Sequence, residues 1–164
     1  MRVYLFLDLD GTLWDHRDVS LMKPPFYNVN SDCIIDSVGD RLCLYNGARD
    51  FLRECSRSGV VVSALSWNIY SKARRVLELL GIIRYFDYLF IEYNPFKDIV
   101  LEKALKILEK TFGKINDSVI VYVDDRDIHW RYMNRIPYNI VFIHMWRDVR
   151  SFKELLEVVK SISS

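Results

Sequence analysis

Two pairs of carboxylates and one lysine are the residues of this chain whose types and spacing best suit chemistry. Asp8 and Asp10 follow an apolar segment in "FLDLDGTLWD", and Asp124 and Asp125 follow another in "VIVYVDD". Two carboxylates in one small space repel each other and raise the pKa of one, unless a divalent cation lies between them or one carries a proton. Lys97 follows a third apolar segment. With a hydroxyl added, these are the groups that phosphoryl transfer on Mg²⁺ requires.

The elements that must position these residues follow a βαβ pattern. Five short segments rich in β-branched and aromatic residues alternate with longer segments of helical periodicity. The expected strands cover residues 2–9, 59–65, 88–92, 118–123 and 139–145. Three of the helical segments end at Gly59, Gly81 and Gly113, and a last amphipathic helix covers the tail. We therefore predict an α/β, Rossmann-like fold with a doubly wound parallel five-stranded sheet.

The predicted fold brings the polar residues together, because the carboxyl ends of parallel strands meet at one edge of a sheet. Asp8 and Asp10 end the first strand, and side chains that alternate with period two leave both on the same side, with Leu9 opposite. Gly11 allows the sharp turn that follows. Lys97 begins the helix after the third strand, where a cation opposes the helix dipole and is expected to be held for an anion or a carboxylate.

The end of the second strand offers groups that could bind a phosphate. Ser66 lies beside the N-terminus of the next helix, whose free amides favour a phosphate oxygen, and Asn68 can cap that helix. Trp67 could stack on a substrate or serve only in packing. With Thr12, which follows the acidic pair, and Lys97, these are the expected substrate-binding residues. Ser63 lies inside the strand and Lys72 inside a helix, so they are weaker alternatives to Ser66 and Lys97.

A long connection follows the first strand. This insertion, at about residues 15–45, contains two short apolar runs, 33–35 and 42–45, on either side of a polar turn with Gly39. This pattern indicates a β-hairpin. We interpret this insertion as a functional flap over the sheet, too small to be a cap domain. The three cysteines have no zinc spacing and their odd number argues against a disulfide framework, so we expect small buried side chains. A disulfide between Cys33 and Cys43 is conceivable if the two face each other.

Composition sets broader expectations. The 164 residues suit one domain, residues 1–164, and the 23 basic residues nearly cancel the 22 acidic ones, which disfavours a general nucleic-acid binder. The apolar run at the start of the chain is too short for a signal peptide and is soon followed by charged residues, and no apolar run could span a bilayer. We expect a soluble, cytoplasmic protein without membrane contact, and a second copy of the chain could cover an open site.

In their order and their strand ends, these motifs resemble the haloacid dehalogenase (HAD) superfamily of aspartyl-phosphate phosphatases: "DLDGT", the strand-terminal Ser66, Lys97 and "VDD". Within the superfamily, "DLDGTLW", "PPF", a short hairpin in place of a cap domain and "VDDR" resemble the magnesium-dependent phosphatase-1 group. The chain departs from that group at Trp67, where the group has an arginine. The departure bears on substrate preference.

The resemblance implies a two-step mechanism. Asp8 would attack phosphorus and become an aspartyl phosphate, and Asp10 would protonate the leaving group and later deprotonate the attacking water. Mg²⁺ would be held by Asp8, the backbone carbonyl of Asp10 and Asp124, with Asp125 as a further or water-mediated ligand. Lys97 and Ser66 would bind phosphoryl oxygens, and Lys97 would also keep Asp8 ionised.

Open sites admit bulky substrates, so we expect a phosphorylated small molecule such as a sugar phosphate, or a phosphoprotein, phosphotyrosine included. Three alternatives remain. A non-catalytic phospho-aspartate switch uses similar groups but places them in another order along the chain. A degenerate binding scaffold would lack the nucleophile or the acid, and both are present. A nucleic-acid 3′-phosphatase is disfavoured by the near-zero net charge.

Overall fold

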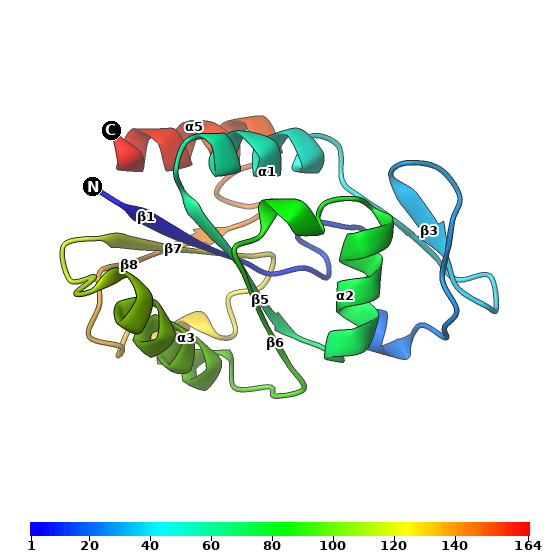
Figure 1. Cartoon of the computed structure of the whole chain (residues 1–164), viewed down its shortest axis with the longest axis horizontal. Helices are drawn as coiled ribbons and strands as arrows, with labels where there is room; N and C mark the ends of the chain where they lie inside the picture. The colour runs from blue at the N-terminus through cyan, green and yellow to red at the C-terminus, as the bar shows by residue number, and fades with distance from the viewer.

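A five-stranded parallel sheet forms the centre of the protein in this computed structural model, which describes residues 1–164 (Figure 1). The strand order is β6-β5-β1-β7-β8, and every neighbouring pair is parallel. The five strands are β1 (Val3–Leu7), β5 (Val61–Trp67), β6 (Tyr88–Glu92), β7 (Val119–Asp124) and β8 (Ile140–His144). The predicted doubly wound sheet is confirmed, and its strand boundaries differ from the predicted ones by at most two residues.

Helices cover both faces of this sheet. Their bounds are α1 (Ala48–Arg57), α2 (Tyr70–Leu79), α3 (Lys97–Phe112), α4 (Trp130–Met133) and α5 (Phe152–Ser163), with 3₁₀ turns η1 (Val19–Leu21) and η2 (Ile83–Tyr85). Figure 1 shows α1 and α5 side by side on one face and α3 on the other. No helix combines the length and the apolar character that crossing a membrane requires.

The central strand β1 divides its side chains between two cores. Val3, Leu5 and Leu7 point into the larger core with α1, α2 and α5. Tyr4 and Phe6 point into the smaller core with α3 and α4. This alternation with period two explains why the strand is apolar throughout, since a parallel strand covered on both faces has no solvent side.

The strand order reverses on either side of β1. The chain runs from β1 outward to β5 and β6, then returns to β7 and β8 on the opposite side. The connections leaving β1 and β7 therefore diverge at the carboxyl edge, which is where open α/β sheets bind their ligands. Asp8 follows β1 directly and Asp124 is the last residue of β7.

The insertion after β1 contains a small antiparallel sheet of three strands, one more than predicted. Strands β2 (Tyr27–Asn28), β3 (Cys33–Ile35) and β4 (Arg41–Cys43) pair in the order β2-β3-β4. Ile34 and Leu42 point into the larger core, and Nδ2 of Asn28 donates to the carbonyl of Leu79 at the end of α2. The small sheet thus packs beside α1 and α2, and that the insertion acts as a flap over the central sheet stays a prediction.

A disulfide joins β3 to β4. Cys33 and Cys43 are directly opposed in the register, with their Cα atoms 4.1 Å apart, and their sulfurs are bonded. The conceivable disulfide between Cys33 and Cys43 is therefore present, and Cys55 is free and buried. Sequence could not settle the register because a slip by one residue would place the two side chains on opposite faces.

Asp36 organises the turn between β3 and β4, and its removal tests this part of the fold. Its carboxylate accepts hydrogen bonds from the amides of Lys23 (2.8 Å), Val38 (3.0 Å) and Asp40 (2.8 Å). The Lys23 amide, aided by those of Asp40 and Val38, holds the pKa of Asp36 below its usual value. Asp36 therefore contributes stability above its unfolded pKa of about 3.9, and this contribution is lost as the pH falls through the lower folded value.

We expect Asp36→Ala to lower Tm by several degrees at pH 7, and the gap to the wild type to shrink below about pH 4. Thermal unfolding of both proteins at pH 7 and pH 3 measures this. Asp117→Ala is the control, because Asp117 is exposed and should leave Tm unchanged at either pH. An equal gap for Asp36→Ala at both pH values would contradict the role given to the carboxylate.

Candidate active site

A cavity of about 420 Å³ opens at the carboxyl edge of the sheet, where the strand order reverses. Its walls come from residues 8–20, the ends of β5 and β6, the start of α3 and the segment after β7. Of the predicted site residues, Asp8, Asp10, Trp67, Lys97 and Asp125 line it. The structure thus assembles one polar site from segments that are far apart in the sequence.

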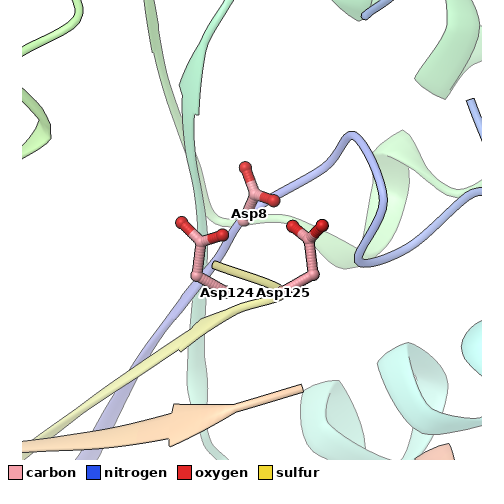
Figure 2. A group of neighbouring side chains, drawn as sticks. All are labelled: Asp8, Asp124 and Asp125. Atoms are coloured by element: carbon pink, nitrogen blue, oxygen red, sulfur yellow. The ribbon is translucent and has the colours of Figure 1, made fainter. Parts of the chain in front are cut away.

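Three carboxylates gather at this site, two in the cavity lining, Asp8 and Asp125, and one fully buried beside them, Asp124. Asp8, Asp124 and Asp125 each offer one oxygen atom, and the three atoms lie within 4.8 Å of one another. Figure 2 shows the three side chains, one from the segment after β1 and two from the end of β7, with their carboxylates around a common space. Asp8 and Asp124 are buried and Asp125 is half-buried. Asp8 groups with Asp124 and Asp125, whereas Asp10 lines the same cavity but is not part of this group.

Lys97 neutralises part of this acidic group. Its ammonium lies 2.7 Å from Oδ1 of Asp8 and 2.8 Å from Oδ2 of Asp124, and the side chain is only 2% exposed. The position of Lys97 as the first residue of α3 is unfavourable for the helix dipole, and the two ion pairs offset that cost. The expectation that Lys97 is held there for carboxylates agrees with these contacts.

Burial sets the direction of the pKa shifts in this group. Burial and the charge of Asp124 raise the pKa of Asp8 well above its usual value, although Lys97 acts against them. Lys97 thus acts on Asp8 in the expected direction, toward the ionised form, and its effect is outweighed by burial and by Asp124. Burial also disfavours the charged form of Asp124, but the charge and hydrogen bond of Lys97 outweigh it and lower that pKa. Burial acts to lower the pKa of Lys97, and the charges of Asp8 and Asp124 raise it overall.

Asp10 lines the same cavity but lies in a different environment. Its side chain takes no part in the close carboxylate group and makes no ion pair. Burial raises its pKa to about 6, while hydrogen bonds from Trp14 and the Val19 amide lower it. Asn68 is fully buried and donates to Asp10 from Nδ2 at 2.9 Å. The side chain of Asn68 is therefore directed at Asp10 and not at a substrate, contrary to expectation.

Thr12 is also used inside the protein. It is fully buried, and its Oγ1 lies 2.9 Å from Oδ2 of Asp8 and 3.2 Å from Oδ1 of Asp125, while it accepts the Asp125 amide at 3.0 Å. The hydroxyl has one proton, so it can donate to only one of the two carboxylates at a time. The predicted phosphate contact of Thr12 does not fit this placement. The residue instead ties the segment after β1 to the end of β7.

Ser66 and Trp67 end β5 next to the cavity. Ser66 is buried and does not line the cavity wall, whereas Trp67 is 40% exposed and does. Tyr93 follows β6 on the neighbouring strand, and its ring centroid lies 6.3 Å from that of Trp67. These two rings are the only apolar side chains in a wall that also carries Arg17 and Arg126, two exposed arginines.

Several residues that support the site were not predicted from the sequence. The hydroxyl of Tyr122 donates to Oδ2 of Asp124 inside the smaller core. Trp146 adopts a positive φ of 72° and donates from Nε1 to the carbonyl of Gly11 at 2.8 Å. His144 Nε2 lies 2.9 Å from the carbonyl of Asp125. Tyr122 could have been found from the period of β7, whereas Trp146 and His144 follow only from the three-dimensional structure.

The donor set fits a magnesium ion. Oxygen atoms of carboxylates are the protein ligands that Mg²⁺ prefers. When ionised, Asp8, Asp124 and Asp125 carry three negative charges against the single charge of Lys97, so the group has excess negative charge for a cation to balance. The acidic residues that could hold a metal are therefore Asp8, Asp124 and Asp125, while the side chain of Asp10 is directed elsewhere.

The comparison with known families agrees with this arrangement. The sequence model of the Acid Phosphatase family matches residues 2–149, nearly the whole chain. The chain belongs to the Acid Phosphatase family. It is accordingly a phosphoric monoester hydrolase. No curated protein sequence matches the chain significantly.

Solved structures of HAD phosphatases and hydrolases share the fold. A HAD-superfamily hydrolase from Ehrlichia chaffeensis aligns with a TM-score of 0.68 at 11% identity over 98% of this chain and 97% of that one. The HAD domain of the Legionella pneumophila effector Lem4 aligns with a TM-score of 0.64 at 14% identity, over 98% of this chain and 96% of that one. The N-terminal part of a Bacteroides fragilis protein, which contains a phosphatase domain and is complexed with Mg, gives 0.60 at 13%. That alignment covers 99% of this chain but only 40% of the Bacteroides chain. The predicted α/β, Rossmann-like fold is confirmed, and these structures share it.

Gly11 provides a test of the carboxylate group. It has a φ of +72°, and a Cβ placed on it would lie 2.5 Å from Oδ2 of Asp125. We expect Gly11→Ala to push the Asp125 carboxylate out of the group and to lower the affinity for Mg²⁺ by about tenfold or more, as removal of supporting contacts at metal sites does. Isothermal titration with MgCl₂ measures the affinity.

Gly39→Ala is the matched control for this experiment. Gly39 also has a positive φ, +92°, but nothing lies within 4 Å of a Cβ placed there. Both substitutions therefore carry a similar backbone cost, and only Gly11→Ala has the clash. Equal Mg²⁺ affinities for the two variants would show that the placement of Asp125 has no part in metal binding.

Proposed function

We propose that the protein is a Mg²⁺-dependent phosphomonoesterase that acts through an aspartyl-phosphate intermediate in an open active site. The observation that carries the proposal is the arrangement of three carboxylates around a common space with a buried lysine, next to a separate carboxylic acid in the same cavity. A metal held by Asp8, Asp124 and Asp125 would neutralise charge on the phosphoryl oxygens.

The first step forms a bond between an Asp8 oxygen and phosphorus and breaks the bond from phosphorus to the ester oxygen. Asp10 gives its proton to the departing oxygen, so that an alcohol leaves. A buried acid with a pKa of about 6 suits this role, since it can hold a proton near neutral pH and release it readily. Lys97 places a positive charge beside Asp8, where it stabilises the negative charge that gathers during transfer.

The second step regenerates the enzyme. Asp10, now ionised, takes a proton from a water molecule, and the water oxygen attacks phosphorus of the aspartyl phosphate. The bond between phosphorus and Asp8 breaks, inorganic phosphate leaves and Asp8 returns to its carboxylate form. We propose Ser66 as a ligand of a phosphoryl oxygen that would have to approach beyond the cavity wall, since Ser66 is buried near the end of β5 beside Trp67, which lines that wall.

The cavity suggests the substrate classes. Residues 17–20 of the insertion contribute one wall, and the small antiparallel sheet does not close the mouth. A phosphotyrosine side chain or a sugar phosphate could enter, with the leaving group against Trp67 or Tyr93. We assign the chain to the magnesium-dependent phosphatase-1 group on the motifs "DLDGTLW", "PPF" and "VDDR", with Trp67 as its departure from that group.

Hydrolysis of p-nitrophenyl phosphate tests the proposal. We expect turnover by the wild type with Mg²⁺, loss of turnover with EDTA, and a loss of at least about 10³-fold in Asp8→Asn, which removes the nucleophile while keeping the shape of the side chain. Asp50→Asn is the control, because Asp50 is exposed and does not line the cavity.

Two results would contradict the proposal. Turnover that persists in Asp8→Asn would assign the chemistry to another nucleophile. Absence of turnover in a folded wild type with several phosphate esters would favour the phospho-aspartate switch or the binding scaffold.

A further inference from the structure

The Asp10 carboxylate is held at both of its oxygens. Nε1 of Trp14 donates to Oδ1 at 2.7 Å, and Nδ2 of Asn68 donates to Oδ2 at 2.9 Å. The amide of Val19 lies 3.3 Å from each oxygen. Donors on both oxygens fix the plane of a carboxylate, which otherwise rotates freely about its last bond. Asp10 is the only carboxylate of the cavity held in this way without a lysine or arginine.

Asn68 is itself locked in place. It is fully buried in the connection between β5 and α2, and its backbone N–H donates to the carbonyl of Glu92 at 3.0 Å. Its Oδ1 accepts the amide of Ile69 at 3.0 Å, which fixes the orientation of the side chain. A flipped side chain would turn its oxygen toward Asp10 and its NH₂ group toward an N–H, and both contacts would be lost. Asn68 therefore presents a donor to Asp10 in one defined direction.

Trp14 is equally constrained. Its side chain is fully buried in the larger core, so the ring cannot rotate without opening that core. Its carbonyl also accepts the amide of Gly11 at 3.0 Å, which closes the turn that carries Asp10. The indole N–H therefore reaches Asp10 from a rigid position.

The third donor depends on the turn at Val19. Nζ of Lys72 in α2 donates to the carbonyls of Ser20 and Met22, at 2.7 Å each, and ties this turn to the helix. Oδ1 of Asp18 accepts the Ser20 amide at 3.0 Å and caps the turn. The segment after β1, with Trp14 and Val19, and the segment after β5, with Asn68, thus both donate to the carboxylate of Asp10.

We propose that Asn68 and Trp14 are positioning residues for Asp10: they hold its carboxylate in the one orientation in which it can transfer a proton to the leaving group. This inference rests on the proposed function, because it assumes that Asp10 is the general acid. Neither residue touches the carboxylate group of Asp8, Asp124 and Asp125, so their effect should be confined to proton transfer. Precise orientation of a catalytic group is worth up to about 10²-fold in rate.

The test compares two esters that differ in their need for an acid. p-Nitrophenolate leaves without a proton, whereas the alkoxide of benzyl phosphate needs one. We expect Asn68→Ala and Trp14→Phe each to lower kcat/KM for benzyl phosphate at least about tenfold more than for p-nitrophenyl phosphate. Trp14→Phe keeps a ring in the core and removes only the donor, so it serves if Asn68→Ala folds poorly. Trp130→Phe, a tryptophan substitution in the smaller core, should leave the ratio unchanged.

The same substitutions in an Asp10→Asn background separate positioning from a merely structural role. If Asn68 acts through Asp10, then Asn68→Ala should cause no further loss in single-turnover release of p-nitrophenolate or benzyl alcohol once Asp10 is replaced. Equal losses for both esters in the single variants, or a persistent loss in the Asp10→Asn background, would overturn the positioning inference alone. A folded wild type that hydrolyses neither ester would contradict the proposed function itself.

Discussion

The site depends on the buried ammonium of Lys97 between Asp8 and Asp124. Two buried carboxylates at the ends of neighbouring parallel strands would repel each other, and one lysine with two short contacts makes their proximity tolerable. Removing one partner of such a buried group typically costs about 3–5 kcal/mol, because the remaining charges stay unpaired. The pairing of β1 with β7, the start of α3 and the position of Asp8 are thus coupled through one side chain.

The polar residues of the cavity divide into two groups with different surroundings. Asp8, Asp124 and Asp125 are close together and share a lysine, which suits charge neutralisation and metal binding. Asp10 is surrounded by neutral donors from Trp14 and Asn68, which suits a residue that exchanges a proton. Two acids separated by one residue in the sequence thereby have different surroundings, because β1 ends at Leu7 and the chain turns at Gly11.

Sequence reasoning found the residues at strand ends because period and fold class determine which side chains meet at an edge. Asp8, Lys97 and Asp124 are such residues. Asn68 and Thr12 were predicted to bind substrate, but they contact Asp10 and Asp125 instead. These contacts depend on loop paths that no periodicity encodes. Strand β2, which was not predicted, has only two residues, too few for a pattern. The position of the small sheet beside α2 depends on contacts between distant segments. The left-handed backbone of Trp146 likewise has no signal in residue type.

The most direct test of the central claim is to locate the phosphoryl group during turnover. Asp10→Asn should form the aspartyl phosphate from p-nitrophenyl phosphate and hydrolyse it slowly, since the base for the second step is missing. After acid quenching and proteolysis, mass spectrometry should find one phosphoryl group on the peptide that contains Asp8, and none in the Asp8→Asn/Asp10→Asn double variant. Release of p-nitrophenolate with no phosphoryl group on that peptide, or with one on another residue, would contradict the account.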